Sequence, residues 1–426
     1  MKILVINQPL NNRGDESAHK GLIRKLLKEF PLDQVEVFFV AENADSIKQF
    51  AVDDKRVVYK SYLSKSNSEG FFYKYLYEKL VVLTLFFRYL NGCLFLGLHY
   101  LWWLNPLIWP VIKIIRNADI VLCAPGGICM GGFQSWPHIS YLYLAKLLKK
   151  HTYYYGRSIG PFPEDNAKQK RFKQISLELL DSFVFTSLRD VKSQKIAQLF
   201  SVKFEPTIDS AFLDTPIKQL PPEIIQMLPR KYIVFVPNAL IWHYAYKNIP
   251  KESIIKMYMQ MLDMLLQSYP DCKVVMLPQT FNYRDPLWND INFFKEIKKQ
   301  YLQKDKIVIV NDSYSSDIQQ TIISEAALIV GARYHSIVFA INNKVAFIAL
   351  CYEHKMLGLL EQLGALKSSI QINDLSSQDK IDQILLEFNN KLHNLVSYDK
   401  CLAYEAKKIA EDCFMKFKTK VTREAQ

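Results

Sequence analysis

Residues 327–340 read A-L-I-V-G-A-R-Y-H-S-I-V-F-A, with Arg333 and His335 placed between two apolar runs. The first run, short, rich in β-branched residues and ended by Gly331, is typical of a buried strand. Burying a charge without a partner costs several kcal/mol or more. Arg333 and His335 must therefore face solvent, an internal acid or an anionic ligand, and this stretch alone leaves all three open.

Similar apolar runs alternate with helix-patterned stretches along the whole chain, which is typical of parallel α/β architecture. Five runs in each half predict two Rossmann-like, doubly wound lobes. The strand candidates are KILVINQ (2–8), VEVFFVA (35–41), ADIVLCAPGG (118–127), HTYYYGRSIG (151–160), SFVFTSLRD (182–190), KYIVFVPNA (231–239), CKVVMLPQT (272–280), KIVIVND (306–312), ALIVGARYH (327–335) and VAFIALCY (345–352).

The domain boundary is expected in residues 212–232, where four prolines interrupt the pattern and the strand pattern then restarts. This places a first lobe at 1–215 and a second lobe at 216–384. Residues 385–426 are helix-patterned and mixed in charge. In two-lobed sheets of this kind such a tail often packs back onto the first lobe, so we expect it to do so.

The composition of the 426-residue chain favours an enzyme with an anionic partner. Lysine and arginine exceed aspartate and glutamate by 12, which indicates contact with phosphates, an acidic glycan, a membrane surface or nucleic acid. The lysines are dispersed and no nucleic-acid-binding module is recognised. Seven scattered cysteines without a CxxC or HExxH motif predict free thiols and no metal site. The N-terminus reads as a strand without a signal peptide, which predicts a cytoplasmic protein.

One apolar segment, residues 71–115, allows two interpretations. Residues 89–112 carry no formal charge and are long enough to span a bilayer, but prolines and polar residues interrupt them. The segment forms either a pair of core helices or a monotopic patch on the inner leaflet, with basic residues meeting anionic headgroups. Those basic residues are Lys74, Lys79, Arg88, Lys113 and Arg116. Four tryptophans in or near the segment pack in the core, stack on a sugar or meet lipid headgroups, namely Trp102, Trp103, Trp109 and Trp136.

Ligands of open α/β sheets bind in the loops at the carboxyl ends of the strands. After the first strand, Gly14 and Asp15 lie where a helix is expected to start, with Asp15 or Ser17 as its N-cap. The backbone amides of such a start point at an anion, although a plain capped turn explains the same residues. Residues 124–132, A-P-G-G-I-C-M-G-G, match neither GxGxxG nor a P-loop, but Gly126 and Gly127 allow the backbone to approach a ligand closely.

Further strand-end loops supply Arg157, Arg189, Arg333 and His335. A single arginine in such a loop is usually solvated or salt-bridged. The occurrence of several cations at one predicted edge instead favours a site for an anion.

Taken together and in order, these motifs resemble the polysaccharide pyruvyl transferase family. The likeness extends over about residues 6–364, and its specific part is the combination of R-Y-H-S with Y-E-H-K. The resemblance implies a two-lobed, glycosyltransferase-B-like fold and the transfer of pyruvate from phosphoenolpyruvate onto a sugar diol as a cyclic ketal. The implied acceptor is a cell-surface glycan or its lipid-linked precursor. The motifs are NNRGDESAHKGL (11–22), PGG (125–127), GRSIGPF (156–162), SLRDVKS (187–193), PTIDSAF (206–212) and GARYHSIVFAINNKVAFIALCYEHKMLGLL (331–360).

The resemblance also implies roles for individual residues. Arg333 and His335 would face the phosphate, and Arg189, with Arg157, would meet the carboxylate or phosphate. His335 would act as general acid and Asp15 as base for the acceptor hydroxyl. No cofactor is implied beyond the donor substrate. The remaining implied substrate-binding residues are Gly14, Gly126, Gly127, Ser336 and Lys355.

Two features depart from the family pattern. The glycine turn continues as I-C-M after P-G-G, and relatives often carry glutamine where Arg157 stands. These departures leave open the role of the turn and of Arg157.

Two alternative functions stay open at the level of sequence. A two-lobed glycosyltransferase using a nucleotide sugar would need an acid for the ribose hydroxyls, and Glu325 or Glu353 could serve. An inactive, membrane-associated scaffold of a glycan assembly complex would need no catalytic residue. For an enzyme acting on a lipid-linked glycan, we expect a cytoplasmic protein that is peripheral on the inner face of the membrane.

Overall fold

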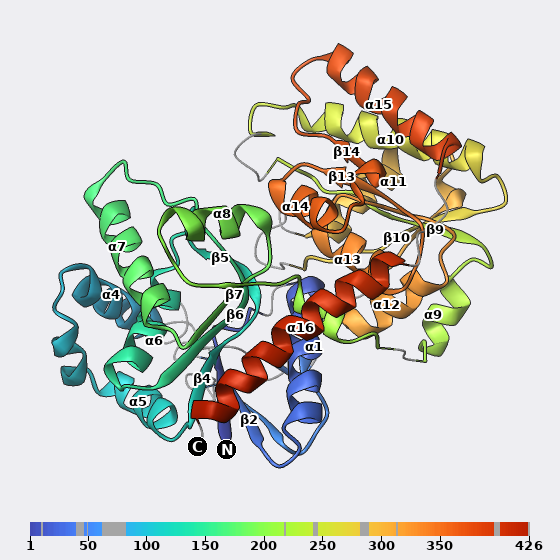
Figure 1. Ribbon diagram of the computed structural model, residues 1–426. Coiled ribbons are helices and arrows are strands. Elements are labelled where there is room, and N and C mark those ends of the chain that lie inside the picture. The colour runs from blue at the N-terminus through green and yellow to red at the C-terminus, as the bar shows by residue number, and fades with distance from the viewer. Residues whose placement is uncertain are drawn as a thin grey trace, which may run out of the picture. The chain divides into compact units, whose positions relative to one another are not determined.

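The computed structural model describes residues 1–9, 12–39, 47–48, 50–61, 82–216, 219–241, 246–281, 289–311, 314–395 and 401–424. The chain forms two compact units (Figure 1). Unit 1 comprises residues 1–10, 18–214 and 409–426. Unit 2 comprises residues 11–17 and 215–408.

The chain passes from unit 1 to unit 2 at residues 214 and 215, beside the predicted boundary. Two segments differ from the predicted division. Residues 11–17 belong to unit 2, and the predicted tail 385–426 is divided, because residues 385–408 belong to unit 2 and residues 409–426 to unit 1. The reason is that helices α1 and α16 each run from one unit into the other, which a pattern of apolar residues does not reveal.

Among the described residues, the sheet of unit 1 has eight strands, and every strand pair in it is parallel. The strand order is β3-β2-β1-β4-β6-β7-β8, with β5 also paired to β6. The chain therefore leaves β1 in one direction and returns on its other side at β4. The strands are β1 (Lys2–Ile6), β2 (Gln34–Phe39), β3 (Val57–Ser61), β4 (Ile120–Cys123), β5 (Gly126–Met130), β6 (His151–Ile159), β7 (Phe185–Leu188) and β8 (Glu205–Pro206).

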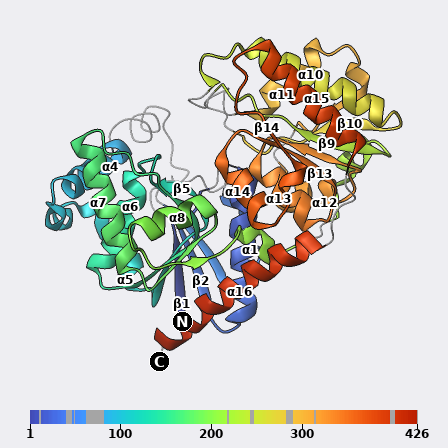
Figure 2. The ribbon, with the colours of Figure 1, turned by 45° about the horizontal axis from the view of Figure 1, so that its top comes forward.

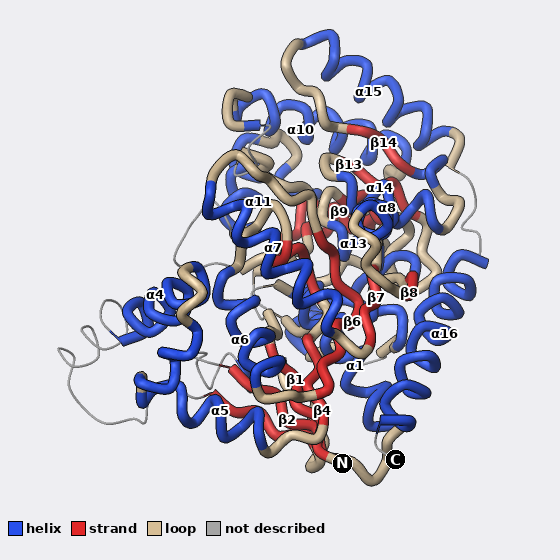
Figure 3. The backbone as a smooth tube through the Cα atoms, turned by 60° about the vertical axis from the view of Figure 1, so that its left-hand side comes forward, coloured by secondary structure: helices blue, strands red, loops and turns tan. Residues whose placement is uncertain are grey.

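Helices cover both faces of this sheet (Figure 3). Successive side chains of a strand point to opposite faces, and Leu4 and Ile6 pack in one apolar cluster with helices α4 to α8. The helices of unit 1 are α1 (Arg13–Glu29, from residue 18 onward), α4 (Val82–Phe95), η1 (His99–Leu104), η2 (Pro106–Ile108), α5 (Trp109–Arg116), α6 (Trp136–Leu147), α7 (Ala167–Ser182), α8 (Val191–Leu199) and η3 (Ser210–Leu213).

The end of helix α16 (Cys401–Glu424) covers the other face of the unit 1 sheet, as Figure 3 shows. Phe417 is fully buried, and its ring centroid lies 5.3 Å from Tyr153 and 5.4 Å from Tyr155. Residues 153 and 155 share a face because strand side chains alternate, and Tyr154 between them stacks on Phe183 at 5.5 Å on the opposite face. The expected return of the C-terminal helix to the first lobe is confirmed.

The sheet of unit 2 has six strands in the order β11-β10-β9-β12-β13-β14, all parallel. The order reverses between β9 and β12, so the prediction of a second doubly wound sheet is confirmed. The strands are β9 (Tyr232–Val236), β10 (Lys273–Met276), β11 (Ile307–Ile309), β12 (Ile329–Gly331), β13 (Phe347–Cys351) and β14 (Ser369–Gln371).

The helices of unit 2 also form two layers, with α10, α11 and α15 on one side of the sheet and α12, α13 and α14 on the other (Figure 2). Apolar side chains of α10, α11 and α15 share one core cluster with every strand of the sheet. The helices are α9 (Pro222–Met227), α10 (Lys251–Ser268), α11 (Asp290–Gln300), η6 (Lys304–Lys306), α12 (Ser316–Ser324), α13 (Tyr334–Asn342), α14 (His354–Gln362), η7 (Leu366–Ser368) and α15 (Gln378–His393).

The apolar segment 71–115 is described from residue 82 onward, and its first part lies outside the described residues. Within the described part of the chain, no helix is both long and apolar enough to cross a bilayer. Trp102 and Trp136 are buried, at 1% and 6% exposure, and belong to the core. Trp103 and Trp109 are exposed, at 37% and 59%. The core interpretation therefore holds for part of the segment only.

Candidate functional site

The first turn of helix α1 lies against the first turn of helix α13 within unit 2. An added Cβ at Gly14 would lie 1.7 Å from Nδ1 of His335. The imidazole thus rests directly on the Cα of Gly14, a distance that only glycine permits. Two motifs from opposite ends of the sequence, N-N-R-G-D and R-Y-H-S, are therefore in contact.

The start of α1 is capped by Asn12 and not, as the sequence predicted, by Asp15 or Ser17. The amide of Asp15 donates to Oδ1 of Asn12 at 2.7 Å, and the side-chain nitrogen of Asn12 donates to Oδ2 of Asp15 at 2.5 Å. This reciprocal pair resembles a capping box, in which the third helical residue returns the hydrogen bond of the cap. The predicted caps were wrong, Asp15 by three positions and Ser17 by five, because the helix begins earlier, at Arg13.

A buried acid fixes this turn to the rest of unit 2. Glu16 is fully buried, accepts from Nη1 of Arg13 at 2.8 Å, and accepts from the amide of Ser316 at 3.0 Å. Ser316 is the first residue of α12. The amide of Arg13 also donates to the carbonyl of Gln279, after β10, at 3.0 Å. Residues 11–17 are thereby held at the carboxyl ends of the unit 2 strands.

Arg333, directly after β12, is ion-paired with Asp290. Of the three options that the sequence left open, the structure shows the internal acid. The second carboxylate oxygen of Asp290 accepts from the amides of Gln279 and Thr280, at 3.0 Å and 2.9 Å. Burial acts to lower the pKa of Arg333, but Asp290, with Tyr352 and Tyr258, raises that pKa above its ordinary value. Arg333 is therefore a cation at any working pH.

Ser336 is fully buried at the start of α13. Its hydroxyl donates to the carbonyl of Arg333 at 2.5 Å, and an added Cβ at Gly331 would lie 2.0 Å from that hydroxyl oxygen. The structure gives Ser336 a part in the turn between β12 and α13. A contact between Ser336 and substrate stays a prediction.

The two acids of the glycosyltransferase alternative lie at opposite edges of the sheet, and Lys355 shares the edge of Glu353. Lys355, in the first turn of α14, pairs with Glu353 at 3.4 Å, after the carboxyl end of β13. Glu325 lies between the end of α12 and the start of β12, at the edge where strands begin. Since ligands bind at the opposite edge, Glu353 is the better placed acid of the two.

In unit 1, Arg157 fills the space between the ends of β1 and β4. Its Nε donates to the carbonyl of Ala124 at 2.6 Å, and Nη2 donates to the carbonyl of Asn7 at 2.7 Å. Nη1 contacts the carbonyl of Gly127 at 3.3 Å and Sγ of Cys129 at 3.1 Å. Arg157 is 1% exposed and lies at the switch point of the sheet. This geometry gives it a part in ordering the glycine turn, and direct contact with substrate stays a prediction.

The two glycines of this turn differ in what surrounds them. An added Cβ at Gly126 would lie 3.3 Å from Nη2 of Arg157 and 3.4 Å from Pro9. At Gly127 it would meet nothing within 4 Å. Packing therefore explains the glycine at position 126 but leaves the glycine at position 127 unexplained by any described neighbour.

Arg189 is ion-paired with Asp209, and both are buried, at 5% and 0% exposure of their side chains. Nε of Arg189 lies 3.4 Å from the hydroxyl of Ser158. Asp209 also caps helix η3 by accepting from the amide of Ala211 at 3.0 Å. The arginine thus joins the end of β7 to the turn that follows β8.

The structure brings Gly14, Asp15, Arg333, His335 and Ser336 together in unit 2, with Lys355 after the neighbouring strand. Arg157, Arg189, Gly126 and Gly127 form a second group at the carboxyl edge of the unit 1 sheet. That the two groups serve one ligand stays a prediction. Sequence reasoning missed Asn12, Glu16 and Asp290, for which the only signal was an asparagine or acid at a helix start after a strand.

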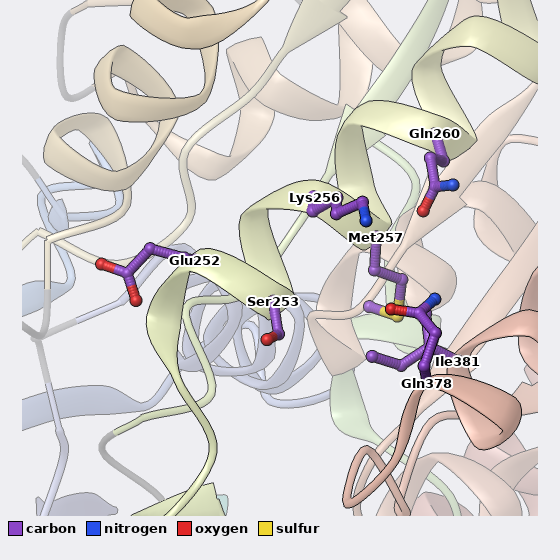
Figure 4. Close-up of a pocket in the computed structure, with 7 residues that line it drawn as sticks. All are labelled: Glu252, Ser253, Lys256, Met257, Gln260, Gln378 and Ile381. Carbon is purple, nitrogen blue, oxygen red and sulfur yellow. The ribbon is translucent and has the colours of Figure 1, made fainter.

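Neither a metal site nor a further pocket adds to these residues in the described ranges of the chain. No group of three or more histidine, cysteine or acidic side chains in the described ranges could hold a metal ion. A small hollow of about 190 Å³ lies between α10 and α15 (Figure 4). These helices cover the face of the unit 2 sheet opposite α12, α13 and α14 (Figure 2). The lining of the hollow contains none of the predicted residues and consists of Glu252, Ser253, Lys256, Met257, Gln260, Gln378 and Ile381.

A family model described as "Polysaccharide pyruvyl transferase" matches residues 12–354. The chain belongs to the polysaccharide pyruvyl transferase family. The matched range includes Gly14 and His335, the two residues of unit 2 whose contact joins the motifs. The description of the family names transferases that act on polysaccharides.

Comparison with curated proteins gives a relative in amylovoran biosynthesis. The chain is 25% identical over 260 residues to the "Amylovoran biosynthesis protein AmsJ" of Erwinia amylovora. The match covers 59% of this chain and 60% of that protein, so the chain spans about three fifths of the length of its relative.

Solved structures show the glycosyltransferase-B-like fold. A UDP-N-acetylglucosamine 2-epimerase from Neisseria meningitidis has a TM-score of 0.54 at 10% identity, covering 98% of this chain and 100% of that one. A putative UDP-N-acetylglucosamine 2-epimerase from Listeria monocytogenes has a TM-score of 0.54 at 12% identity, with 94% and 93% coverage. A trehalose 6-phosphate synthase from Burkholderia multivorans has a TM-score of 0.51 at 10% identity, with 100% and 99% coverage. At these identities the likeness confirms the predicted fold class and says nothing of the substrate.

Proposed function

We propose that this polysaccharide pyruvyl transferase moves pyruvate from phosphoenolpyruvate onto a sugar diol of a cell-surface glycan or its lipid-linked precursor, as a cyclic ketal. The observation that carries the proposal is the contact between Gly14 and His335 in unit 2. It joins the two motifs on which the family resemblance most depends, at the edge of a sheet where ligands bind.

The reaction requires an acid that protonates a carbon atom of phosphoenolpyruvate and bases that accept the protons of the sugar hydroxyls. Protonation of the methylene carbon of phosphoenolpyruvate leaves a cationic centre at the neighbouring carbon. One sugar hydroxyl attacks that carbon and loses its proton. A second hydroxyl then attacks the same carbon and loses its proton. The bond between that carbon and the phosphate oxygen breaks, phosphate leaves, and the ring closes. The products are the ketal and inorganic phosphate, so atoms balance without an oxidant or reductant.

His335 is the candidate acid, because histidine is the side chain that most often serves as a general acid and its ring lies in the first turn of α13. Asp15, whose neighbour Gly14 contacts that ring, is the candidate base for the acceptor hydroxyl. Both residues belong to unit 2, so the assignment rests on the geometry of one unit.

The electrostatics of the site differ from the sequence prediction. Phosphoenolpyruvate carries about three negative charges near neutral pH, yet Arg333 is paired with Asp290 and Lys355 with Glu353. Arginine carries five N–H donors and a carboxylate accepts at most two of them, so an ion pair does not by itself prevent an arginine from contacting a second anion. Binding of the donor would then depend on directed N–H groups, the N-terminal ends of α1 and α13, and His335, more than on net charge.

The test is restoration of a pyruvate ketal in cells. A strain lacking the protein, and lacking any duplicate enzyme, should lose the methyl signal of the ketal from its surface glycan. The wild-type chain should restore the signal and His335→Gln should not, at equal protein level. Retention of the signal in the deletion strain would refute the proposed function.

An assay with purified protein separates the proposal from the glycosyltransferase alternative. The proposal expects acceptor-dependent release of phosphate from phosphoenolpyruvate, and the alternative expects release of nucleotide from a sugar nucleotide. Under the alternative, Glu353→Ala should abolish activity. If the protein were an inactive scaffold, the His335→Gln variant would restore the ketal signal of the deletion strain as well as the wild-type chain does.

A further inference from the structure

Exposed apolar side chains are concentrated on one part of unit 1, along η1, η2 and the adjoining ends of α4 and α5. Leu96, Tyr100, Leu104 and Trp109 are 66%, 59%, 74% and 59% exposed, although all are large and apolar or aromatic. The other exposed large apolar side chains of the described chain are scattered singly along the sequence. We call these four residues, together with Phe95 and Trp103, the aromatic face.

The aromatic face is firmly supported from below. Phe86, Leu90, Trp102, Ile108 and Ile115, from the same segment, are 1% exposed and belong to the core cluster of unit 1. The exposed residues are thus the outer side of a layer whose inner side packs on the sheet. The exposure does not come from a loose end of the chain.

Contacts join the members of the face to one another. Nε1 of Trp109 donates to the carbonyl of Trp103 at 3.0 Å, and the guanidinium of Arg116 lies 5.9 Å from the ring of Trp103. At the other end, Phe95 packs edge-on against Trp136 at 6.0 Å. Trp136 follows a loop whose Phe133 is 63% exposed, so the apolar surface continues there.

The sequence segment that carries the aromatic face contains basic residues and no acid. The sequence has no aspartate or glutamate between Glu78 and Asp119, whereas it contains Arg88, Lys113 and Arg116. All three basic residues are exposed in the structure. A segment that combines exposed leucine, tryptophan and tyrosine with cations, and that itself contains no acid, complements a bilayer whose headgroups are anionic.

Two other interpretations of the aromatic face, a glycan site and part of a membrane span, fit less well. A glycan would stack on Trp103 or Trp109, but Leu96 and Leu104 offer it no hydrogen bonds and would stay in water. A helix that spans the membrane is absent from the described part of the chain. A shallow interfacial contact explains the leucines, the aromatic rings and the cations together.

We infer that the aromatic face is a membrane-binding surface that inserts Leu96, Leu104 and Trp109 into the headgroup region of a bilayer containing anionic lipid. Arg88, Lys113 and Arg116 then meet the lipid phosphates. This inference concerns a part of unit 1 separate from the residues of the proposed catalytic site. It would place an enzyme of polysaccharide modification at the surface where a lipid-linked acceptor is held.

Binding to vesicles tests the inference and involves neither phosphoenolpyruvate nor glycan, so its failure and the failure of the proposed function are distinguishable. The full chain is sedimented with vesicles of phosphatidylcholine alone or with 30% phosphatidylglycerol, a composition chosen to supply about the charge of an anionic leaflet. We expect binding to the anionic vesicles at least tenfold tighter than to the neutral ones.

Two variants and two controls decide which residues bind. Leu104→Ser combined with Trp109→Ala should weaken binding to anionic vesicles at least tenfold, and Lys113→Glu combined with Arg116→Glu should abolish the preference for anionic lipid. Leu199→Ser and Leu302→Ser, at leucines 76% and 96% exposed outside the face, should leave binding unchanged. Unchanged thermal midpoints show that the variants fold.

Three results would overturn the inference. The wild-type chain could fail to sediment with anionic vesicles, or the two control leucine variants could weaken binding as much as the variants of the face. Alternatively, sedimentation velocity without lipid could show a dimer that the Leu104→Ser and Trp109→Ala changes dissociate, which would make the face an interface between copies of this chain.

Discussion

At the scale of single residues, the candidate site of unit 2 is a set of close contacts around His335. Its ring lies on Gly14, and the neighbouring Arg333 is held by Asp290, which also binds two backbone amides of the loop after β10. Each of these residues therefore has one measurable task, either to position the imidazole or to hold a charge in a buried place.

Gly14→Ala should reduce ketal formation by roughly 100-fold, because the new methyl group must displace the imidazole, and catalysis is lost steeply with misplacement. The measurement is the ketal methyl signal in a complemented deletion strain, together with the thermal midpoint. Gly92→Ala, in α4, is the control, since an added Cβ there meets nothing within 4 Å. Full activity of Gly14→Ala would show that the position of His335 is unimportant.

Asp290→Ala should destabilise unit 2 by about 3 kcal/mol, because removing one partner of a buried ion pair leaves the other charge uncompensated. Urea unfolding measures this. Asp271→Ala removes an acid that is 79% exposed and lies 3.4 Å from Lys231, so its cost should stay below about 1 kcal/mol. Equal effects of the two substitutions would contradict the view that Arg333 depends on Asp290.

At the scale of elements, α16 is the part of unit 1 that comes from farthest along the chain. Phe414, Phe417 and Val421 are fully buried against the sheet. Nζ of Lys418 donates to Glu29 at 2.9 Å. The hydrogen bonds from Lys418 and Lys25 lower the pKa of Glu29 below its ordinary value. The helix therefore contributes both apolar core and ion pairs to unit 1.

Phe417→Ala should destabilise unit 1 by about 3 to 5 kcal/mol, the usual cost of deleting a buried aromatic ring. The ring lies 5.8 Å from Phe185 in addition to its contacts with Tyr153 and Tyr155. Met415→Ala, at a position that is 45% exposed on the same helix, should change the unfolding midpoint little. A mild effect of Phe417→Ala would mean that the sheet face is stable without this helix.

The elements were largely predictable from the sequence, and the exceptions share a cause. Each of the ten predicted strands contains a strand of the structure, because buried parallel strands read as continuous apolar runs. The strands that were missed include β3, at the edge of its sheet, where Val57–Ser61 alternates between half-buried and exposed residues. Short strands at edges, such as β8 and β14, give too little apolar pattern to be recognised.

The candidate site was less predictable than the fold. Arg333 and His335 follow β12 at the strand end where they were expected. Gly14 was expected in the first lobe, after β1, but the structure places it in unit 2. Their acidic partners were not expected, because Asp290 reaches Arg333 only through the packing of the loop after β10. Ion pairs between distant segments depend on tertiary structure, and no local pattern marks them.

At the scale of the whole molecule, each unit is built from separate parts of the chain. Residues 11–17 belong to unit 2 although residues 18–214 continue in unit 1, and residues 409–426 return to unit 1. Opposite ends of one helix, α1, are therefore parts of different cores. A substitution at one end should affect one unit and spare the other.

Glu16→Ala should raise hydrogen exchange at the amides that begin α12, since Glu16 accepts from Ser316, and should leave the strands of unit 1 protected. Glu29→Ala, on the same helix, should do the reverse by loosening residues 409–424. Hydrogen–deuterium exchange with peptide resolution measures both. Exchange that rises throughout the chain in either variant would show that the units do not respond separately.

The divided composition of unit 1 also determines when it can be completed during synthesis. Domains usually fold in the order in which they leave the ribosome. Here Phe417 and Val421 fill the first unit, so its core stays open until residues beyond 409 have emerged, by which time every residue of the second unit is already outside. The unit that is translated first is thus finished last, and its exposed tyrosine face must be kept from aggregation in the interval.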